Sequence, residues 1–268
     1  MLKDITLGQY FPGDTVAHKL DPRTKILLVV LYIIALFCAK SLLTYGIMAL
    51  CLAVCVRISC VRVKAMVRGL RPVLFIILFT AVLNLFFTPG ERTLVQLGIL
   101  RVSDTGLRTA FFMVLRIMLL IMGTFLMTYT TSPISLTDGL ERLLGWLKRF
   151  RVPVHELAMM MSIALRFIPT LIEETDKIMS AQKARGADLE SGNLIQKAKA
   201  MIPILVPLFI SAFRRADELA TAMECRCYHG GEGRTRMKQL HLAGRDYAAL
   251  VVSALFLAGI IVLRHFGL

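Results

Sequence analysis

Two arginine residues in the second half of the sequence have similar neighbours, each lying between small residues and four positions after an alanine. The two segments are Ala184-Arg185-Gly186 and Cys225-Arg226-Cys227. Small neighbours let another surface come close to the guanidinium, whose planar fork can bind a carboxylate through two parallel hydrogen bonds. Alternatively, each arginine only stabilises the carbonyl groups at the end of its own helix. The sequence leaves both roles open.

The sequence contains no complete site for ATP, for a metal ion or for catalysis. No phosphate-binding motif of the form Gly-x-x-x-x-Gly-Lys-Ser/Thr occurs, so ATP and magnesium should be bound by another chain, and no cofactor is expected in this one. Cys225, Cys227 and His229 lie close together, but alternate helix positions face apart and a fourth ligand is missing, so no metal site is expected. No paired carboxylates or serine–histidine set appears in residues 131–245, the most polar part of the chain. The chain is therefore predicted not to be an enzyme.

The composition indicates a membrane protein. Of the 268 residues, 56% are hydrophobic and 19% are charged, and the mean hydropathy is +0.68. Soluble domains carry about 25% charged residues. The polar residues here are too few to cover a surface that faces water, so much of the surface must face lipid. The net charge of +14 is explained by basic cytoplasmic loops, and no nucleic-acid partner is expected.

Apolar runs predict five membrane-spanning helices. The run 26–56 is interrupted only by Lys40 and Ser41 and has basic residues before and after it, so it should turn near Lys40 and return to the cytoplasmic side. Further spans are predicted at 73–87, 109–130 and 247–263. After the third span, alternating apolar residues over 94–102 predict a small β-hairpin.

The predicted fold class is an all-α polytopic membrane protein with about five transmembrane helices and a cytoplasmic or interfacial domain of three helices. Residues 1–130 should hold four spans and a cytoplasmic N-terminus, residues 131–245 the cytoplasmic domain, and residues 246–268 the fifth span. The cytoplasmic domain includes two apolar stretches, 157–172 and 200–213. If both crossed the membrane, the basic residues between them would lie outside, so we expect both to stay at the inner surface.

Three helices are predicted in the cytoplasmic domain. The segment Ser135-Leu136-Thr137-Asp138 resembles a capping box, which would begin a helix that reaches about Phe150. The other two helices should cover 153–185 and 193–228, because each ends close to glycine residues that stop a helix.

Arg116 and Asn84 are the notable polar residues inside the predicted spans that follow the first hairpin. A charge in the membrane normally faces protein, water or the interface, so Arg116 could orient neighbouring helices or extend to the membrane surface. A stand-alone secondary carrier, the alternative function, needs more ionisable groups near mid-membrane than these spans offer.

Five segments follow one another in an order that is typical of one family. They are His18-Lys19-Leu20-Asp21-Pro22-Arg23-Thr24-Lys25, Thr130-Thr131-Ser132-Pro133, Ala164-Leu165-Arg166-Phe167-Ile168-Pro169, Ala181-Gln182 with Ala184-Arg185-Gly186, and Ala222-Met223-Glu224 through Gly230-Gly231-Glu232-Gly233-Arg234-Thr235. From about residue 8 to 240, the chain therefore resembles the transmembrane T component of energy-coupling factor (ECF) transporters.

The resemblance implies a non-catalytic scaffold in the plasma membrane of a prokaryote. Such a scaffold couples two cytoplasmic ABC ATPases to a membrane-embedded S component that captures a vitamin or a metal ion. In that family two Ala-Arg-Gly motifs dock into grooves of the two ATPases. The docking residues would be Ala184, Arg185, Gly186, Cys225, Arg226 and Cys227. The second motif departs from the family pattern, because two cysteines replace the usual alanine and glycine, but both are small.

The two long cytoplasmic helices also carry apolar residues that could contact the S component. They are Met159, Met160, Met161, Ile168, Leu205 and Phe209. Methionine side chains adapt to different surfaces, so this set would suit S components that are exchanged on one scaffold. Ordinary packing between helices explains the same residues equally well.

Overall fold

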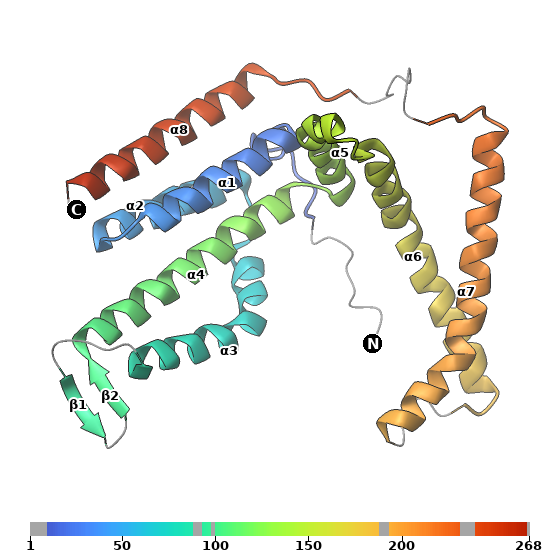
Figure 1. The fold of residues 1–268 in the computed structure, drawn as a ribbon, viewed down its shortest axis with the longest axis horizontal. Helices are drawn as coiled ribbons and strands as arrows, with labels where there is room; N and C mark the ends of the chain where they lie inside the picture. The colour runs from blue at the N-terminus through green and yellow to red at the C-terminus, as the bar shows by residue number, and fades with distance from the viewer. Residues whose placement is uncertain (1–9, 88–92, 98–99, 188–192, 231–238, 267–268) are drawn as a thin grey trace. The chain divides into compact units, whose positions relative to one another are not determined.

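The structure is a computed structural model, and it describes residues 10–87, 93–97, 100–187, 193–230 and 239–266. These residues form eight α-helices, one 3-10 helix and two short strands (Figure 1). In chain order they are α1 (Pro22–Cys38), α2 (Leu42–Ser59), α3 (Val63–Phe87), β1 (Thr93–Leu97), β2 (Leu100–Ser103), α4 (Asp104–Thr130), α5 (Pro133–Leu143), η2 (Leu144–Phe150), α6 (Val154–Ala184), α7 (Leu194–Glu224) and α8 (Gly244–His265). The predicted helical fold class and the small antiparallel hairpin are both confirmed.

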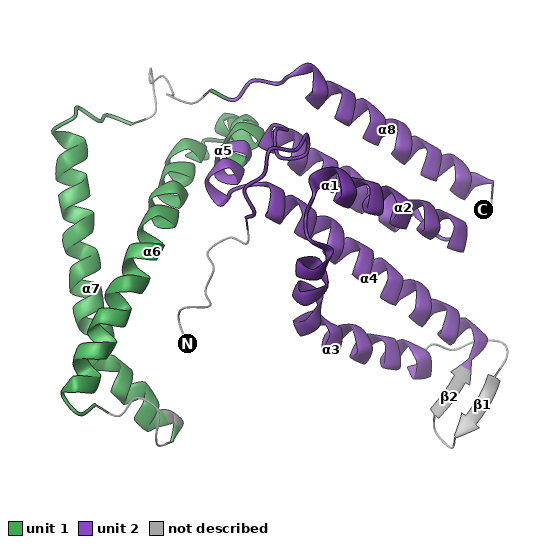
Figure 2. Ribbon diagram, turned by 180° about the vertical axis from the view of Figure 1, so that it is seen from behind, with its two compact units in different colours: residues 1–7, 140–239 green, residues 8–139, 240–268 purple. Residues whose placement is uncertain are grey.

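The chain divides into two compact units (Figure 2). Of the described residues, 10–139 and 240–266 belong to unit 2, which contains α1 to α4 and α8. Unit 1 consists of described residues between 140 and 239, including η2, α6 and α7, and α5 continues from one unit into the other. Its assignment to the cytoplasm remains a prediction.

The turn between α1 and α2 lies where the charge pattern predicts it. Helix α1 ends at Cys38 and α2 begins at Leu42. Ser41 and Thr44 form a reciprocal capping box at the start of α2, which satisfies backbone donors that the helix leaves free. Each of the two helices is about 26–27 Å long, slightly short of a bilayer core of about 30 Å.

Helix α4 packs against α1, α2 and α3, while α8 packs against α1. The core of unit 2 includes the buried side chains of Leu36 and Tyr129. Close packing of α1 on α4 depends on Gly123, because a Cβ there would lie 2.5 Å from the ring of Tyr32. The hydroxyl of Tyr32 in turn donates a hydrogen bond to the carbonyl oxygen of Leu119 (3.2 Å).

Six helices in the described part of the chain are long and apolar enough to cross a membrane: α2, α3, α4, α6, α7 and α8. In unit 2, large side chains such as Phe75 of α3 (74% exposed) and Leu255 of α8 (68% exposed) face outward, as lipid-facing residues do. The number of candidate spans is close to the five predicted, and the chain is a multi-pass membrane protein. For α6 and α7, length and composition allow a span, whereas the charge pattern favours the cytoplasm.

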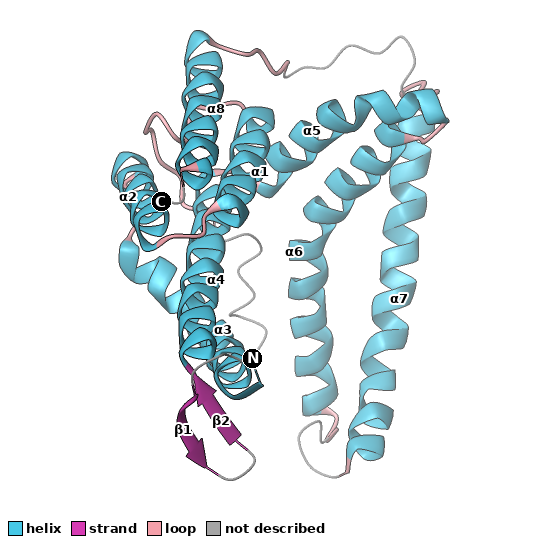
Figure 3. Cartoon of the chain, turned by 60° about the vertical axis from the view of Figure 1, so that its left-hand side comes forward, coloured by secondary structure: helices cyan, strands magenta, loops and turns pink. Residues whose placement is uncertain are grey.

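Unit 1 is built around α6 and α7, two helices of 31 residues that run in opposite directions (Figure 3). Their bounds agree with the predicted helices to within a few residues. The start of α5 differs from the prediction: Ser132 Oγ accepts a hydrogen bond from the N–H of Ser135 (3.2 Å), so the capping box predicted at Ser135 is wrong. Pro133 favours the first position of a helix, which makes the preceding serine the cap.

Candidate functional site

The end of α6 has a well-defined backbone geometry around Arg185. The next residue, Gly186, has a φ of +83°, in the left-handed region that favours glycine. The N–H of Gly186 donates to the carbonyl of Lys183 (3.0 Å), and the N–H of Ala187 donates to that of Gln182 (3.0 Å). This pair of bonds is a Schellman motif, which satisfies carbonyl groups that the helix end leaves free.

The end of α7 repeats this geometry with cysteine in place of glycine. Cys227 has a φ of +55°, and its N–H donates to the carbonyl three residues earlier (2.8 Å). The N–H of Tyr228 donates to the carbonyl of Met223 (3.1 Å). Arg226 therefore stands directly before the left-handed residue, in the position that Arg185 has at the end of α6.

Backbone bonds at both helix ends leave the two arginine side chains available. Arg185 and Arg226 are exposed, and among the described residues neither guanidinium has a hydrogen-bond or ion-pair partner. Backbone N–H groups bind three of the last carbonyls of each helix, and neither arginine side chain takes part in these bonds. An exposed guanidinium of this kind can bind a carboxylate of another chain through two parallel hydrogen bonds.

Polar contacts tie α6 to α7 along their length. Near the middle, Glu174 accepts hydrogen bonds from the hydroxyl of Ser211 (2.5 Å) and the guanidinium of Arg215 (3.0 Å). Toward the end of α6, the Gln182 amide donates to the carbonyl of Pro203 (3.2 Å). That carbonyl lacks its usual partner within α7, because the residue four positions later is a proline without an N–H.

The same contacts place the two arginines at opposite ends of the helix pair. The hydroxyl of Tyr228, just after α7, lies 3.0 Å from the sulfur of Met159, near the start of α6. A helix of 31 residues is about 46 Å long. The two arginines, each next to the same backbone turn, therefore lie several tens of ångströms apart, which suits two separate binding partners.

The apolar residues singled out in the sequence occupy different environments. Met160 (57%), Leu205 (46%) and Phe209 (63%) are exposed. Met161 is exposed as well, whereas Ile168 is half-buried and the half-buried Met159 contacts Tyr228. Large exposed apolar patches often mark a contact with lipid or with another protein.

Comparison with known proteins places the chain in a family. Residues 13–237 match the model of a family described as Cobalt transport protein. Energy-coupling factor transporter transmembrane protein EcfT of Clostridium kluyveri is 58% identical over 250 residues, 93% of each chain. The protein of the same name from Bacillus subtilis is 46% identical over 261 residues, 97% of this chain and 98% of its own. The chain belongs to the ECF transporter transmembrane protein family. It is thus the transmembrane component of an ECF transporter and a multi-pass protein of a prokaryotic membrane.

In this ECF transmembrane component, the two polar residues singled out in the membrane helices, Arg116 and Asn84, contact other helices of unit 2. Arg116 of α4 donates to the hydroxyl of Tyr45 (2.9 Å) and to the carbonyl of Ala39 (3.4 Å), in the turn between α1 and α2. Its guanidinium also lies 5.4 Å from the ring centroid of Phe37. Asn84 donates to the carbonyl of Thr80 within α3 (2.8 Å), and its amide lies 3.0 Å from the sulfur of Met113 in α4. Both residues contact neighbouring helices.

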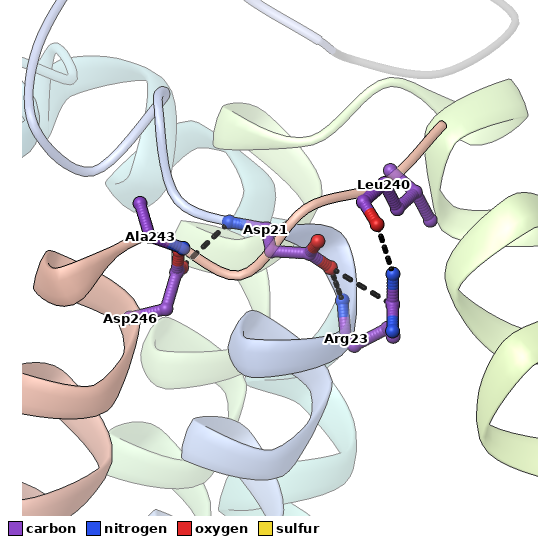
Figure 4. A network of polar contacts seen from close by, with 5 residues as sticks. All are labelled: Asp21, Arg23, Leu240, Ala243 and Asp246. Carbon is purple, nitrogen blue, oxygen red and sulfur yellow. Dashed lines mark hydrogen bonds and ion pairs between the residues drawn. The ribbon is translucent and has the colours of Figure 1, made fainter. Parts of the chain in front are cut away.

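A buried polar network that sequence analysis missed joins α1 to the segment that leads into α8 (Figure 4). Asp246, 1% exposed, accepts hydrogen bonds from the N–H groups of Asp21 (2.8 Å) and Ala243 (2.8 Å). Arg23 donates to the carbonyl of Leu240 (2.8 Å) and lies 3.4 Å from the Asp21 carboxylate. This network, the α1–α8 joint, fixes the residues through which the chain returns from unit 1 to the membrane helices.

The end of α4 is held at the same place. The buried ammonium of Lys25 donates to the carbonyl oxygens of Thr130 (2.7 Å) and His18 (3.2 Å). Segments 18–25 and 130–133, both part of the family resemblance, therefore meet in the folded unit. A sequence signal for this joint exists, because an aspartate before Pro22 is a good helix cap and Asp246 stands at the start of an apolar helix.

Among the described residues, no three histidine, cysteine, aspartate or glutamate side chains are grouped so that they could hold a metal ion. Cys225 and Cys227 are exposed free thiols. The ring nitrogen of His229 lies 2.9 Å from the carbonyl oxygen of Cys227 and so contacts the backbone of the helix end.

Replacing Cys227 by glycine should stabilise the protein by about 1 kcal/mol. A residue with a Cβ is disfavoured in the left-handed region, whereas glycine adopts it freely. The reverse change at the equivalent position, Gly186→Ala, should destabilise by a similar amount, because nothing else lies within 4 Å to alter the outcome. Thermal unfolding of the purified proteins in one detergent measures both effects. Equal midpoints for wild type and both variants would contradict the assignment of the left-handed turns.

Proposed function

We propose that this ECF transmembrane component couples ATP hydrolysis by two ABC ATPases to uptake of a micronutrient, a vitamin or a metal ion, captured by a separate S component. The observation that carries the proposal is a pair of exposed guanidinium groups, those of Arg185 and Arg226, which have no partner among the described residues and lie at opposite ends of the α6–α7 pair. Two equivalent attachment points suit two ATPases, identical or related. The family name Cobalt transport protein, which belongs to the matched family, is consistent with a small essential solute.

The helix pair can transmit movement from the ATPases. Glu174, Ser211 and Arg215 tie α6 to α7 at mid-length, so a shift applied at either helix end moves both helices. Because the exposed residues Met160, Leu205 and Phe209 are apolar, a partner can slide over them without breaking fixed polar bonds. Closure of the two ATPases would then tilt or displace the S component as a rigid body.

The intramembrane residues argue against a stand-alone carrier. Arg116 and Asn84 both contact neighbouring helices, so neither is presented to a transported solute. A secondary carrier places ionisable groups at a central binding site, where its substrate and coupling ions meet.

A charge in the apolar surface of α6 and α7 should separate the two sets of partners. In native membranes, affinity-tagged wild type should co-purify with two ATP-binding chains and a small membrane protein. Met160→Glu or Leu205→Asp should retain the ATPases and lose the small membrane protein together with uptake, because a bare charge must be desolvated on contact.

The matched controls for this experiment are Met160→Leu and Leu205→Met, which keep the side chains apolar and of similar volume. Both should retain all partners and at least half of the uptake. If the charged variants also retained the small membrane protein and full uptake, these residues would not form the contact.

A further inference from the structure

A short segment after α5 combines aromatic, aliphatic and basic side chains. This segment, residues 144–151, comprises η2 and Arg151 and is called the Trp146 segment below. Trp146 is 66% exposed and Phe150 is 69% exposed, and their rings meet edge to face with centroids 5.9 Å apart. Leu144 is 40% exposed. The described part of the chain thus leaves an aromatic pair uncovered.

The geometry of η2 places three of its apolar side chains in one row. A 3-10 helix has three residues per turn, so side chains three apart lie above one another. Leu144, Leu147 and Phe150 form an apolar row. Lys148 lies in the second row, and the third row holds Trp146 and Arg149. The helix ends at Phe150. Arg151 follows with a φ of +60°, and its N–H donates to the carbonyl of Lys148 (3.0 Å).

The charge of the Trp146 segment has a single sign. It contains Lys148, Arg149 and Arg151, all exposed, and no acidic residue. The nearest preceding acid, Glu141, lies 3.0 Å from the ring nitrogen of His155. Three cations next to a tryptophan and a phenylalanine match the chemistry of a membrane surface, where tryptophan prefers the headgroup level and basic residues attract anionic lipids.

The chain connection keeps the Trp146 segment close to the bilayer. Helix α4 ends at Thr130, and only 13 residues separate it from Leu144, 11 of which belong to α5. With a rise of about 1.5 Å per helical residue and about 3.5 Å per extended one, the segment lies within about 25 Å of the end of α4. The Trp146 segment can therefore reach the membrane surface at the end of α4.

We propose that the Trp146 segment binds anionic phospholipid headgroups of the cytoplasmic leaflet. Trp146 and Phe150 enter the boundary between headgroups and acyl chains, and Lys148, Arg149 and Arg151 contact the lipid phosphates. The site fixes the beginning of unit 1 at the membrane surface, so that α6 and α7 move while the Trp146 segment stays bound to lipid. The lipid site rests on the proposed function in one respect, the predicted cytoplasmic placement of unit 1, but it requires neither the ATPases nor the S component.

The test uses the full chain alone, because Trp146 is its single tryptophan and so reports on this segment without interference. The protein is reconstituted in vesicles of phosphatidylcholine, with or without phosphatidylglycerol, and with lipids brominated near the headgroup as quenchers. In vesicles that contain phosphatidylglycerol, Trp146 emission should shift to shorter wavelength and be quenched strongly by bromine. In pure phosphatidylcholine both effects should be smaller.

A triple variant, Lys148→Gln with Arg149→Gln and Arg151→Gln, should remove the response to phosphatidylglycerol. Each basic residue near an anionic surface changes partitioning about fivefold, so the ratio of bound to unbound segment should fall about 100-fold. The matched control, Lys197→Gln with Lys199→Gln on exposed positions of α7, should behave as wild type.

Three results would overturn the lipid site. One is equal quenching of Trp146 in the two lipid compositions, and another is an unchanged response in the triple variant. The third is shielding of Trp146 that appears only after an S component is added, which would assign this surface to protein contact. Failure of ATPase docking would leave the vesicle result unchanged, so the two proposals are tested separately.

Discussion

Replacing both Arg185 and Arg226 by alanine should release the two ATPases from the ECF transmembrane component and abolish uptake. In the proposed complex, each guanidinium pairs with a carboxylate of an ATPase. Removing the arginine would leave that carboxylate buried without its partner, at a cost of about 2–5 kcal/mol per site. Each single variant should therefore bind its ATPase about 30- to 4,000-fold more weakly. Co-purification and uptake are measured on the same membranes.

Three further variants define what the arginines contribute. Arg185→Lys and Arg226→Lys should recover only part of the affinity, because an ammonium does not provide the planar fork. Arg214→Ala removes an exposed arginine from the body of α7 and should leave ATPase binding unchanged. If the double alanine variant still purified with both ATPases in stoichiometric amounts and supported uptake, the docking hypothesis would be wrong.

Asp246→Ala should produce a large loss of stability. Asp246 accepts the N–H groups of Asp21 and Ala243 at 2.8 Å each, and the alanine variant leaves both donors without an acceptor. The cost is about 3 kcal/mol, since bonds to a charged acceptor contribute more than neutral ones and a buried donor keeps its desolvation penalty. A decrease of about 6–12 °C in the unfolding midpoint is expected for a protein of this size.

Two controls distinguish the α1–α8 joint from a general effect of removing an acid. Asp246→Asn keeps one good acceptor oxygen and should lose about half as much. Asp104→Ala removes an exposed acid from the first turn of α4, where the carboxylate interacts only weakly with the helix dipole. The loss in the free energy of unfolding should therefore stay below about 1 kcal/mol. An Asp246→Ala variant as stable as Asp104→Ala would show that the joint contributes little.

The sequence predicts well those features that depend on neighbouring residues. The turn at Lys40 follows from two basic flanks and a serine that caps the next helix. The ends of α6 and α7 follow from apolar periodicity and from Gly186 and Gly230 near the predicted stops. The start of α5 was misplaced by three residues because two serines were available as caps, and only the backbone path shows that Ser132 fills this role.

The partners of these residues were decided by the tertiary structure alone. The sequence shows that Arg185 and Arg226 have similar neighbours, but only the antiparallel packing of α6 and α7 places them at opposite ends of one pair. Likewise, Asp246 finds its donor 225 residues away, at Asp21. Local propensity fixes where helices begin and end because their hydrogen bonds close within four residues. Which helices meet depends on burial summed over the whole chain, and no short segment carries that information.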